Sequence, residues 1–207
     1  MEDSINNIVE CAIKLSEVEI HTNPNIILSE SDFEDLIVNK IRALLLSQSE
    51  KYGVHHQISF YRDGITPTFE EDLDKQHETK AQSNKSTRNY QVDIVILEKD
   101  KMKRTSEHRK GFKYTEPACA IEVKYLHDNE ESKIEDDLKK SSVLCKGEKG
   151  SYLWCVALID SRETQKYEQI KEWYNQYRNN LDDRDKSKLK CALLYKKDRQ
   201  IDWIHEE

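Results

Sequence analysis

Three charged residues interrupt two short apolar segments of this sequence. Asp93 lies within residues 90–97, and Glu122 and Lys124 lie within residues 118–126; both segments are otherwise rich in the β-branched and apolar residues typical of buried strands. Residues two apart on a strand share a face, so Glu122 and Lys124 would project together. A buried carboxylate is costly unless a cation or hydrogen bonds compensate its charge. The three charges therefore predict a functional site.

The chemistry expected of such a group is that of a hard metal ion. Sequential strands are usually neighbours, so the carboxylates of Asp93 and Glu122 would approach each other and would repel without a cation between them. Carboxylate oxygens without a Cys/His cluster favour Mg²⁺ or Mn²⁺. Lys124 could orient or deprotonate a water beside the ion, while the ion polarises a phosphate oxygen and lowers the pKa of that water. These parts would suffice to hydrolyse a phosphodiester.

A plainer interpretation makes the three residues an interior ion pair, or charges on the solvated face of an edge strand. Two acids and one base on neighbouring strands would leave one negative charge uncompensated. The surplus charge favours the interpretation as a site.

The spacing of these residues is that of a known motif. Asp93, followed 29 residues later by Glu122-Val123-Lys124, resembles the PD-(D/E)XK nuclease superfamily, which has the restriction-endonuclease-like fold. The resemblance implies that Asp93 and Glu122 bind the metal together with the backbone carbonyl of Val123. No Pro precedes Asp93, where Gln91-Val92 stands instead.

Glu34 has two interpretations. The resemblance makes it a further catalytic residue, because a Glu on the helix before the motif often completes such sites. The segment Ser31-Asp-Phe-Glu34 is also a capping-box pattern, in which the Glu side chain reaches back to the start of its own helix. Farther along, Asp137-Leu-Lys-Lys140 resembles the Asp-Leu-x-Lys helices that follow the motif in some superfamily members.

The spacing of apolar residues predicts the elements that would position these side chains. It predicts helices over 4–20, 129–145 and 162–179, and a further helix that starts near Ser29 or Ser31 and ends at about Ser49. It predicts strands over 56–62, 90–97, 118–126, 152–159, 191–195 and 201–204. The 152–159 strand is apolar enough to be buried on both faces, and the last two strands are expected at an edge. This order predicts an α/β fold with a mixed β-sheet flanked by helices on both faces and an extra N-terminal helix. The same order resembles the restriction-endonuclease-like core, so the resemblance implies that fold. Residues 1–207 would form one domain with its core at about 29–196.

Two polar segments lie outside these elements. Residues 66–88 contain few apolar side chains and are expected to form an exposed loop or a partly disordered insertion. Residues 98–114 contain seven Lys or Arg against three acids and could form the tip of an antiparallel hairpin. Four basic residues of segment 98–114 are candidate contacts to a nucleic-acid backbone, although charge runs are more often simply solvated: Lys103, Arg104, Arg109 and Lys110.

Composition limits the possible partners. The net charge of −7 provides no global attraction for nucleic acid, so a polyanion would have to be held by a local patch or by bound metal. The five cysteines are odd in number and form no CxxC pair, which favours reduced thiols in a cytoplasmic protein. No apolar segment approaches membrane-spanning length, so no membrane partner is expected.

The expected function is that of a Mg²⁺- or Mn²⁺-dependent nuclease, a DNA endonuclease serving in restriction or phage defence. The alternative is a catalytically inactive nuclease fold that acts as a binding or regulatory subunit of a larger complex, which the net acidity and the dense surface charge would suit. Cleavage of both DNA strands would favour a homodimer. Fold alone does not decide the biological role.

Overall fold

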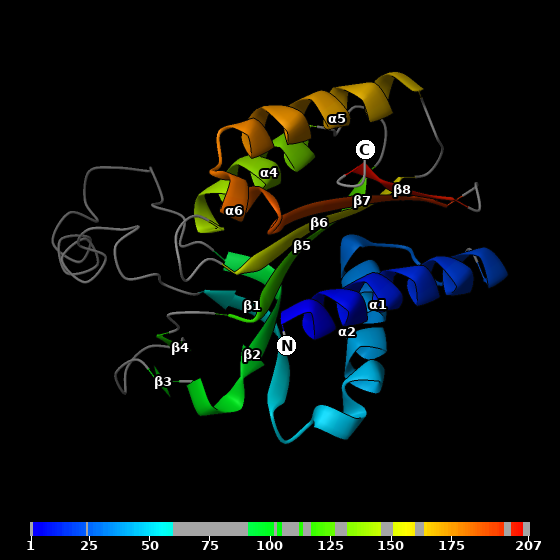
Figure 1. The fold of residues 1–207 in the computed structure, drawn as a ribbon. Helices are drawn as coiled ribbons and strands as arrows, with labels where there is room; N and C mark the ends of the chain where they lie inside the picture. Colours follow the sequence, from blue (N-terminus) through cyan, green and yellow to red (C-terminus); the bar gives the residue numbers. More distant parts are fainter. Residues whose placement is uncertain are drawn as a thin grey trace, which may run out of the picture.

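Six strands form one mixed sheet that runs through the centre of the protein (Figure 1). The computed structural model describes residues 2–23, 25–59, 91–101, 103–104, 112–113, 117–126, 132–145, 151–159, 164–196 and 200–204. The sheet order is β1-β2-β5-β6-β7-β8, with bounds β1 (Tyr52–Ser59), β2 (Gln91–Glu98), β5 (Cys119–Leu126), β6 (Tyr152–Ile159), β7 (Leu189–Tyr195) and β8 (Ile201–Trp203). β1, β2 and β5 form an antiparallel meander, β5, β6 and β7 are parallel, and β8 is antiparallel to β7.

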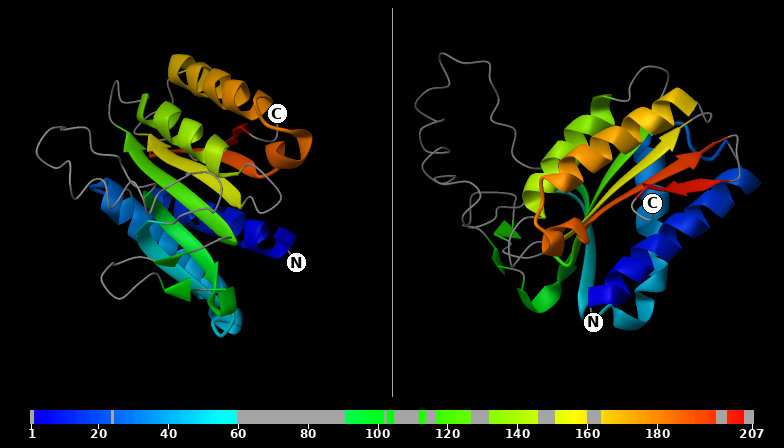
Figure 2. Two further views of the ribbon diagram at one scale, coloured as in Figure 1. Left: turned by 90° about the vertical axis from the view of Figure 1, so that its left-hand side faces the viewer. Right: turned by 45° about the horizontal axis from the view of Figure 1, so that its top comes forward.

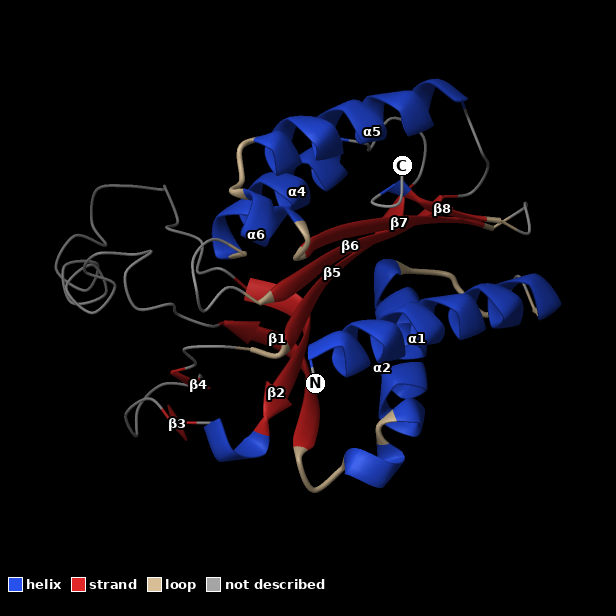
Figure 3. Ribbon diagram, in the orientation of Figure 1, coloured by secondary structure: helices blue, strands red, loops and turns tan. Residues whose placement is uncertain are grey.

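Helices cover both faces of this sheet (Figure 3). α1 (Glu2–Thr22) and α2 (Glu30–Leu44) lie on one face, while α4 (Ser132–Leu144) and α5 (Thr164–Asn179) lie on the other (Figure 2). α4 connects β5 to β6 and α5 connects β6 to β7, as parallel strands require. The short α6 (Asp183–Lys186) precedes β7. The expected mixed sheet, its helices on both faces and the extra N-terminal helix are confirmed.

Alternating side chains of the strands divide the interior into two apolar cores. On β5, Ile121 and Val123 pack with α1 and α2, whereas Ala120 and Leu126 pack with α4 and α5. All but the first residue of β6 are buried, as predicted for a strand covered on both faces. Its Trp154 points toward α1, where the indole Nε1–H donates to Asn6 Oδ1 at 2.9 Å. The additional N-terminal helix is therefore an integral layer of the fold.

Two details of the expected strands are wrong. β1 begins at Tyr52 rather than at residue 56, and Gly53 is part of the strand. A Cβ at Gly53 would come within 2.7 Å of His55 Nε2, so the glycine leaves room for that ring. β7 was expected at an edge, but it lies inside the sheet because β8 pairs with it from Ala192↔Trp203 to Leu194↔Ile201. Only β8 ends that side.

The two polar segments are described only in part. The predicted loop at 66–88 lies outside the described residues. In the basic connection, the 3₁₀ turn η2 (Lys99–Lys101) precedes β3 (Lys103–Arg104), which pairs antiparallel with β4 (Phe112–Lys113). The strands that this connection joins, β2 and β5, pair antiparallel, so the predicted hairpin between them is confirmed.

Two further expectations concern compartment and thiols. Among the described helices, none is both long and apolar enough to cross a membrane. The five cysteines are free; Cys11 is exposed and the other four are buried, three of them in β5, β6 and β7.

Candidate functional site

The predicted site lies where β2 and β5 separate. These strands pair over only three residues, Ile94↔Ile121, Val95↔Ala120 and Ile96↔Cys119. Asp93 and Glu122 follow directly beyond the last pair. There the Val123 N–H donates to Asp93 Oδ2 at 2.8 Å. The Asp93 carboxylate thus takes the place of a strand partner and is held against the backbone of the motif.

The first turn of α2 satisfies the next N–H along the same edge of β5. Tyr125, two residues after Val123, donates its N–H to Glu30 Oε2 at 3.4 Å. The other oxygen of that carboxylate, Oε1, lies 3.5 Å from Lys124 Nζ. Two carboxylates, from β2 and from α2, therefore line the edge of β5 where the strands separate.

Lys124 places its ammonium among these oxygens. Its Nζ donates to the carbonyl oxygen of its neighbour Val123 at 2.8 Å and lies 3.5 Å from Asp93 Oδ2. On the opposite face of the sheet, Asp137 of α4 brings its Oδ2 to 3.3 Å from the same nitrogen. Only 17% of the Lys124 side chain is exposed. Four different elements thus converge on one cation.

The carboxylates control the protonation of Lys124. Burial alone would lower the pKa of its ammonium, but the charges of Asp137, Asp93, Glu30 and Glu122 outweigh burial and raise that pKa above its ordinary value. Lys124 is consequently a firmly held cation at neutral pH.

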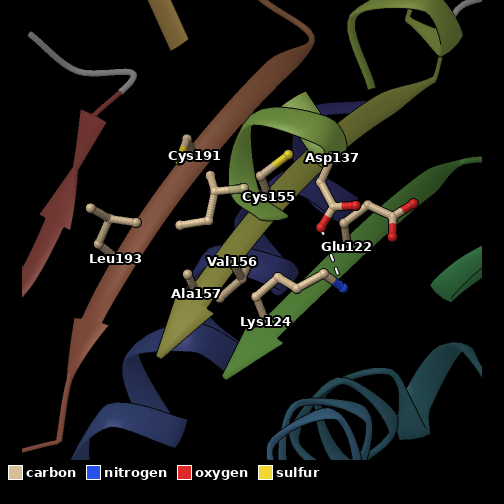
Figure 4. Close-up of a pocket in the computed structure, with 9 residues that line it drawn as sticks. Glu122, Lys124, Asp137, Cys155, Val156, Ala157, Cys191 and Leu193 are labelled. Atoms are coloured by element: carbon tan, nitrogen blue, oxygen red, sulfur yellow. Dashed lines mark ion pairs between the residues drawn. The ribbon is translucent and has the colours of Figure 1, made fainter. Parts of the chain in front are cut away.

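Glu122 and Lys124 share a face of β5, as the alternation of strand side chains predicts. Figure 4 shows both side chains beside Asp137, at one end of a pocket lined by residues of β5, β6, β7 and α4. The rest of that pocket is mostly apolar, with walls that include Ile134, Cys155, Val156, Ala157, Cys191 and Leu193. Glu122 itself is 2% exposed. The low local polarity strengthens every electrostatic interaction at this end of the pocket.

Glu34 does not cap its helix. The capping box of α2 is formed by Ser29 and Asp32: Ser29 Oγ accepts the Asp32 N–H at 3.2 Å, and Asp32 Oδ2 accepts the Ser29 N–H at 2.8 Å. The cap predicted from Ser31 is therefore wrong, because α2 begins at Glu30, before that serine. Glu34 is instead buried in the next turn, 6% exposed.

Glu34 contacts His56 of β1 and is coupled to Asp93. Its Oε1 lies 2.8 Å from His56 Nδ1, and the other ring nitrogen of His56 lies 3.8 Å from Asp35 Oδ1. Burial raises the pKa of Glu34, the His56 hydrogen bond opposes this shift, and the charge of Asp93 adds to it, so the net pKa is raised. Glu34 thus belongs to the electrostatic surroundings of the Asp93 carboxylate.

Three residues of this cluster were not among the predicted site residues. Asp137 had a detectable signal, since it directly precedes the buried Leu138 on α4 and belongs to the Asp-Leu-Lys-Lys segment. Glu30 and His56 had none, because their roles depend on contacts between distant parts of the chain.

The candidate nucleic-acid contacts are only partly placed. Lys103 and Arg104 form β3, in a two-stranded sheet separate from the six-stranded one. Arg109 and Lys110 lie outside the described residues.

The donors predicted to bind a metal can be tested against this geometry. The carbonyl oxygen of Val123 and the carboxylate of Asp93 already surround a cation, the Lys124 ammonium, and both are hard oxygen donors of the kind Mg²⁺ and Mn²⁺ prefer. Within the described ranges, no group of three or more His, Cys, Asp or Glu side chains is arranged to hold a metal ion. Of the three predicted donors, the Asp93 carboxylate and the Val123 carbonyl face the same ammonium, and the chemistry of these two fits such an ion.

The site therefore combines carboxylates from β2, β5, α2 and α4 around one lysine, at the point where the central sheet opens. Lys124 Nζ lies 3.5 Å from Asp93 Oδ2, and Glu122 is near enough for its charge to act on Lys124, as the predicted motif requires. The charge of Asp93 acts in turn on Glu34. No protein-family model matches this chain, and comparisons with curated proteins and with solved structures also find no match.

Proposed function

We propose that this protein is a metal-dependent nuclease with a restriction-endonuclease-like fold, acting on DNA as an endonuclease. The observation that carries the proposal is the convergence of Asp93 and Lys124 beside Glu122, at the end of the β2–β5 ladder. An antiparallel meander followed by two helical crossovers supports the fold assignment. The mostly apolar pocket beside Lys124 and Glu122 also supports the proposal, because low polarity strengthens the interaction of these charges with a metal ion or a phosphate.

Asp93, Glu122 and the carbonyl of Val123 would hold Mg²⁺ or Mn²⁺. The ion would polarise a phosphate oxygen and lower the pKa of the attacking water. Asp93 is pre-positioned for this role, because its bond from the Val123 N–H fixes the carboxylate against β5. Glu34, held by His56, adds negative charge beside Asp93.

Lys124 acts as a hydrogen-bond donor in this proposal. Of the two roles expected for it, orienting the water suits an ammonium that already donates to the Val123 carbonyl at 2.8 Å. A fixed ammonium in a site of low polarity also stabilises the negative charge that develops on the phosphate.

The substrate class follows from the hydrolytic chemistry and from the charge distribution. With a net charge of −7, the protein needs a local basic contact for a polyanion, and Lys103, Arg104, Arg109 and Lys110 are the proposed contacts. Cleavage of both strands of DNA would require two such sites, which suits a homodimer or a partner protein. Restriction and phage defence are the proposed biological settings.

A cleavage assay tests the proposal. Purified protein is incubated with single- and double-stranded DNA and with RNA, in Mg²⁺, Mn²⁺ or EDTA. We expect metal-dependent cleavage of DNA that Lys124→Ala reduces by a factor on the order of 10²–10³. Lys188→Ala is the matched control, because Lys188 is also partly buried and paired, its Nζ lying 2.8 Å from Asp185 Oδ1, but it belongs to no part of the site.

Two results would contradict the proposal. Cleavage that survives Lys124→Ala in a folded protein would remove this site from the reaction. A protein that binds nucleic acid without cleaving it under any metal condition would favour the alternative, a binding or regulatory subunit with a nuclease-like fold.

A further inference from the structure

The ammonium of Lys124 lies among the atoms proposed to bind a metal ion. It donates to the Val123 carbonyl at 2.8 Å and lies 3.5 Å from Asp93 Oδ2. These are two of the three proposed donors, and the third, Glu122, is near enough for its charge to raise the pKa of Lys124. Lys124 therefore occupies the region in which those donors converge.

The local charge balance explains why the ammonium stays there. Lys124 faces four carboxylates, those of Asp93, Glu122, Glu30 and Asp137, all of which act on it electrostatically. Among the described residues, Asp93, Glu30 and Asp137 each bring a carboxylate oxygen to within 3.5 Å of this nitrogen.

A second cation that shares these oxygens with the ammonium is repelled by it. Mg²⁺ binds oxygen at about 2.0–2.1 Å. An ammonium still within hydrogen-bond reach of the same carbonyl would then lie within a few ångströms of the ion, and like charges that close in a partly buried site repel strongly. Lys124 retains other partners, since Asp137 Oδ2 lies 3.3 Å away and Glu30 Oε1 lies 3.5 Å away.

We infer that Lys124 is a stand-in cation: its ammonium fills the position between Asp93 and the Val123 carbonyl in the metal-free protein, and it must withdraw toward Asp137 and Glu30 before a divalent ion can bind. The inference rests on the proposed function and adds a second role to Lys124. The residue sets the metal concentration at which the site fills, and it neutralises part of the carboxylate cluster until then.

The two roles predict opposite effects of one substitution. Lys124→Met preserves much of the aliphatic stem but removes the competing charge, so metal should bind more tightly while cleavage is lost. A lysine that only oriented a water or helped to position the ligands would give unchanged or weaker metal binding when replaced.

Calorimetric titration with Mn²⁺, in the absence of nucleic acid, tests the inference. We expect Lys124→Met to bind Mn²⁺ at least about tenfold more tightly than the wild type, because a like charge has been removed from the site. Lys188→Met should match the wild type, since its ion pair with Asp185 lies outside the site. Asp93→Asn, combined with each form, should abolish the binding.

A second variant protects the test against misfolding. Lys124→Gln is also uncharged but can still donate a hydrogen bond to the Val123 carbonyl, and it should show the same tightening. Circular dichroism establishes that each variant is folded before titration.

The outcomes separate the inference from the proposed function. If the wild type binds Mn²⁺ through Asp93 and the folded Lys124 variants bind it equally or less tightly, the stand-in role is wrong while the metal site stands. If neither the wild type nor any folded Lys124 variant shows Asp93-dependent binding, the metal site and the stand-in role are both wrong. Binding that appears only after Lys124 is replaced would support the inference most strongly.

Discussion

Replacing Asp93 should reveal a structural role of this carboxylate that is separate from metal binding. Asp93 Oδ2 accepts the N–H of Val123, a residue with no exposed surface, at the point where the β2–β5 ladder has ended. Asp93→Ala removes the acceptor and leaves that N–H without it. Asp93→Asn retains a carbonyl oxygen that can accept the same bond, so the two variants form a matched pair.

The magnitude follows from the hydrogen bond and the charges around it. An N–H buried without a partner costs about 1–3 kcal/mol. Loss of the attraction to Lys124, 3.5 Å away, is partly offset by relief of the repulsion between Asp93 and Glu34. We therefore expect Asp93→Ala to lower the free energy of unfolding by about 2 kcal/mol, and Asp93→Asn by less than about 1 kcal/mol.

Urea denaturation in EDTA, followed by tryptophan fluorescence, measures this difference without any contribution from metal. In a chain of this size the larger loss corresponds to a fall in Tm of about 4–8 °C. Asp136→Ala is the control: Asp136 is exposed on α4 beside Asp137, and its replacement should change the free energy by no more than about 0.5 kcal/mol. Equal stability of Asp93→Ala, Asp93→Asn and the control would refute the structural role of Asp93.

Three further predictions concern the helix cap, a titrating carboxyl and the sheet core. Ser29→Ala should lower the free energy of unfolding by about 1 kcal/mol, whereas Ser31→Ala should change it by less than about 0.5 kcal/mol. A larger loss for Ser31→Ala than for Ser29→Ala in urea denaturation would show that Ser31 is the N-cap. Because the pKa of Glu34 is raised in the folded protein, its protonated form contributes stability below the ordinary glutamate range, and this stability is lost as the pH rises through the raised pKa. The Tm of Glu34→Gln should therefore rise relative to that of the wild type from acidic to neutral pH. A Tm difference that does not change with pH would contradict this. Trp154→Ala should cost about 3–5 kcal/mol of unfolding free energy, because Trp154 is fully buried beneath α1, and a small loss in calorimetry would contradict that packing.

Local patterns in the sequence were enough to predict most of the sheet. The run from Tyr152 to Ile159 is apolar throughout, and the strand has the predicted bounds. The predicted strand began at residue 56 and missed Tyr52 to His55, a segment in which Gly53, a residue type depleted in strands, provides room for the His55 ring. The edge position assigned to β7 failed because strand order depends on long-range pairing, here with β8.

The start of α2 shows where local patterns become ambiguous. Ser29 and Ser31 are each followed three residues later by an acid, so the sequence contains two overlapping capping boxes. In the fold, Lys196 of the loop after β7 donates to the carbonyl of Ile27 at 2.9 Å and fixes the chain just before Ser29. The long-range contact between Lys196 and Ile27 thus accompanies capping by Ser29. With Ser29 as the cap, Glu34 is not needed at the helix start and contacts His56 instead.

Some residues of the site could be predicted from local sequence patterns, and others could not. Asp93, Glu122 and Lys124 were predictable because charge within an apolar strand is a local anomaly. Glu30 was not, since it lies 94 residues before Lys124 and reaches it only through the docking of α2 against β5. Asp137 reaches the same ammonium from α4 on the opposite face. The lysine was thus visible in the sequence, but the carboxylates that hold it from the two helices depend on the packing of both layers.

Cleavage of supercoiled plasmid DNA by the wild type and by Glu122→Gln is the most direct test of the proposed nuclease. The substitution preserves the shape of a side chain that is 2% exposed and removes only its charge, so the fold should survive while the metal site loses a donor. We predict nicking or linearisation by the wild type in Mg²⁺ or Mn²⁺, none in EDTA, and none by Glu122→Gln with either metal. Cleavage by Glu122→Gln at the wild-type rate, or no cleavage by the wild type with either metal, would contradict the assignment.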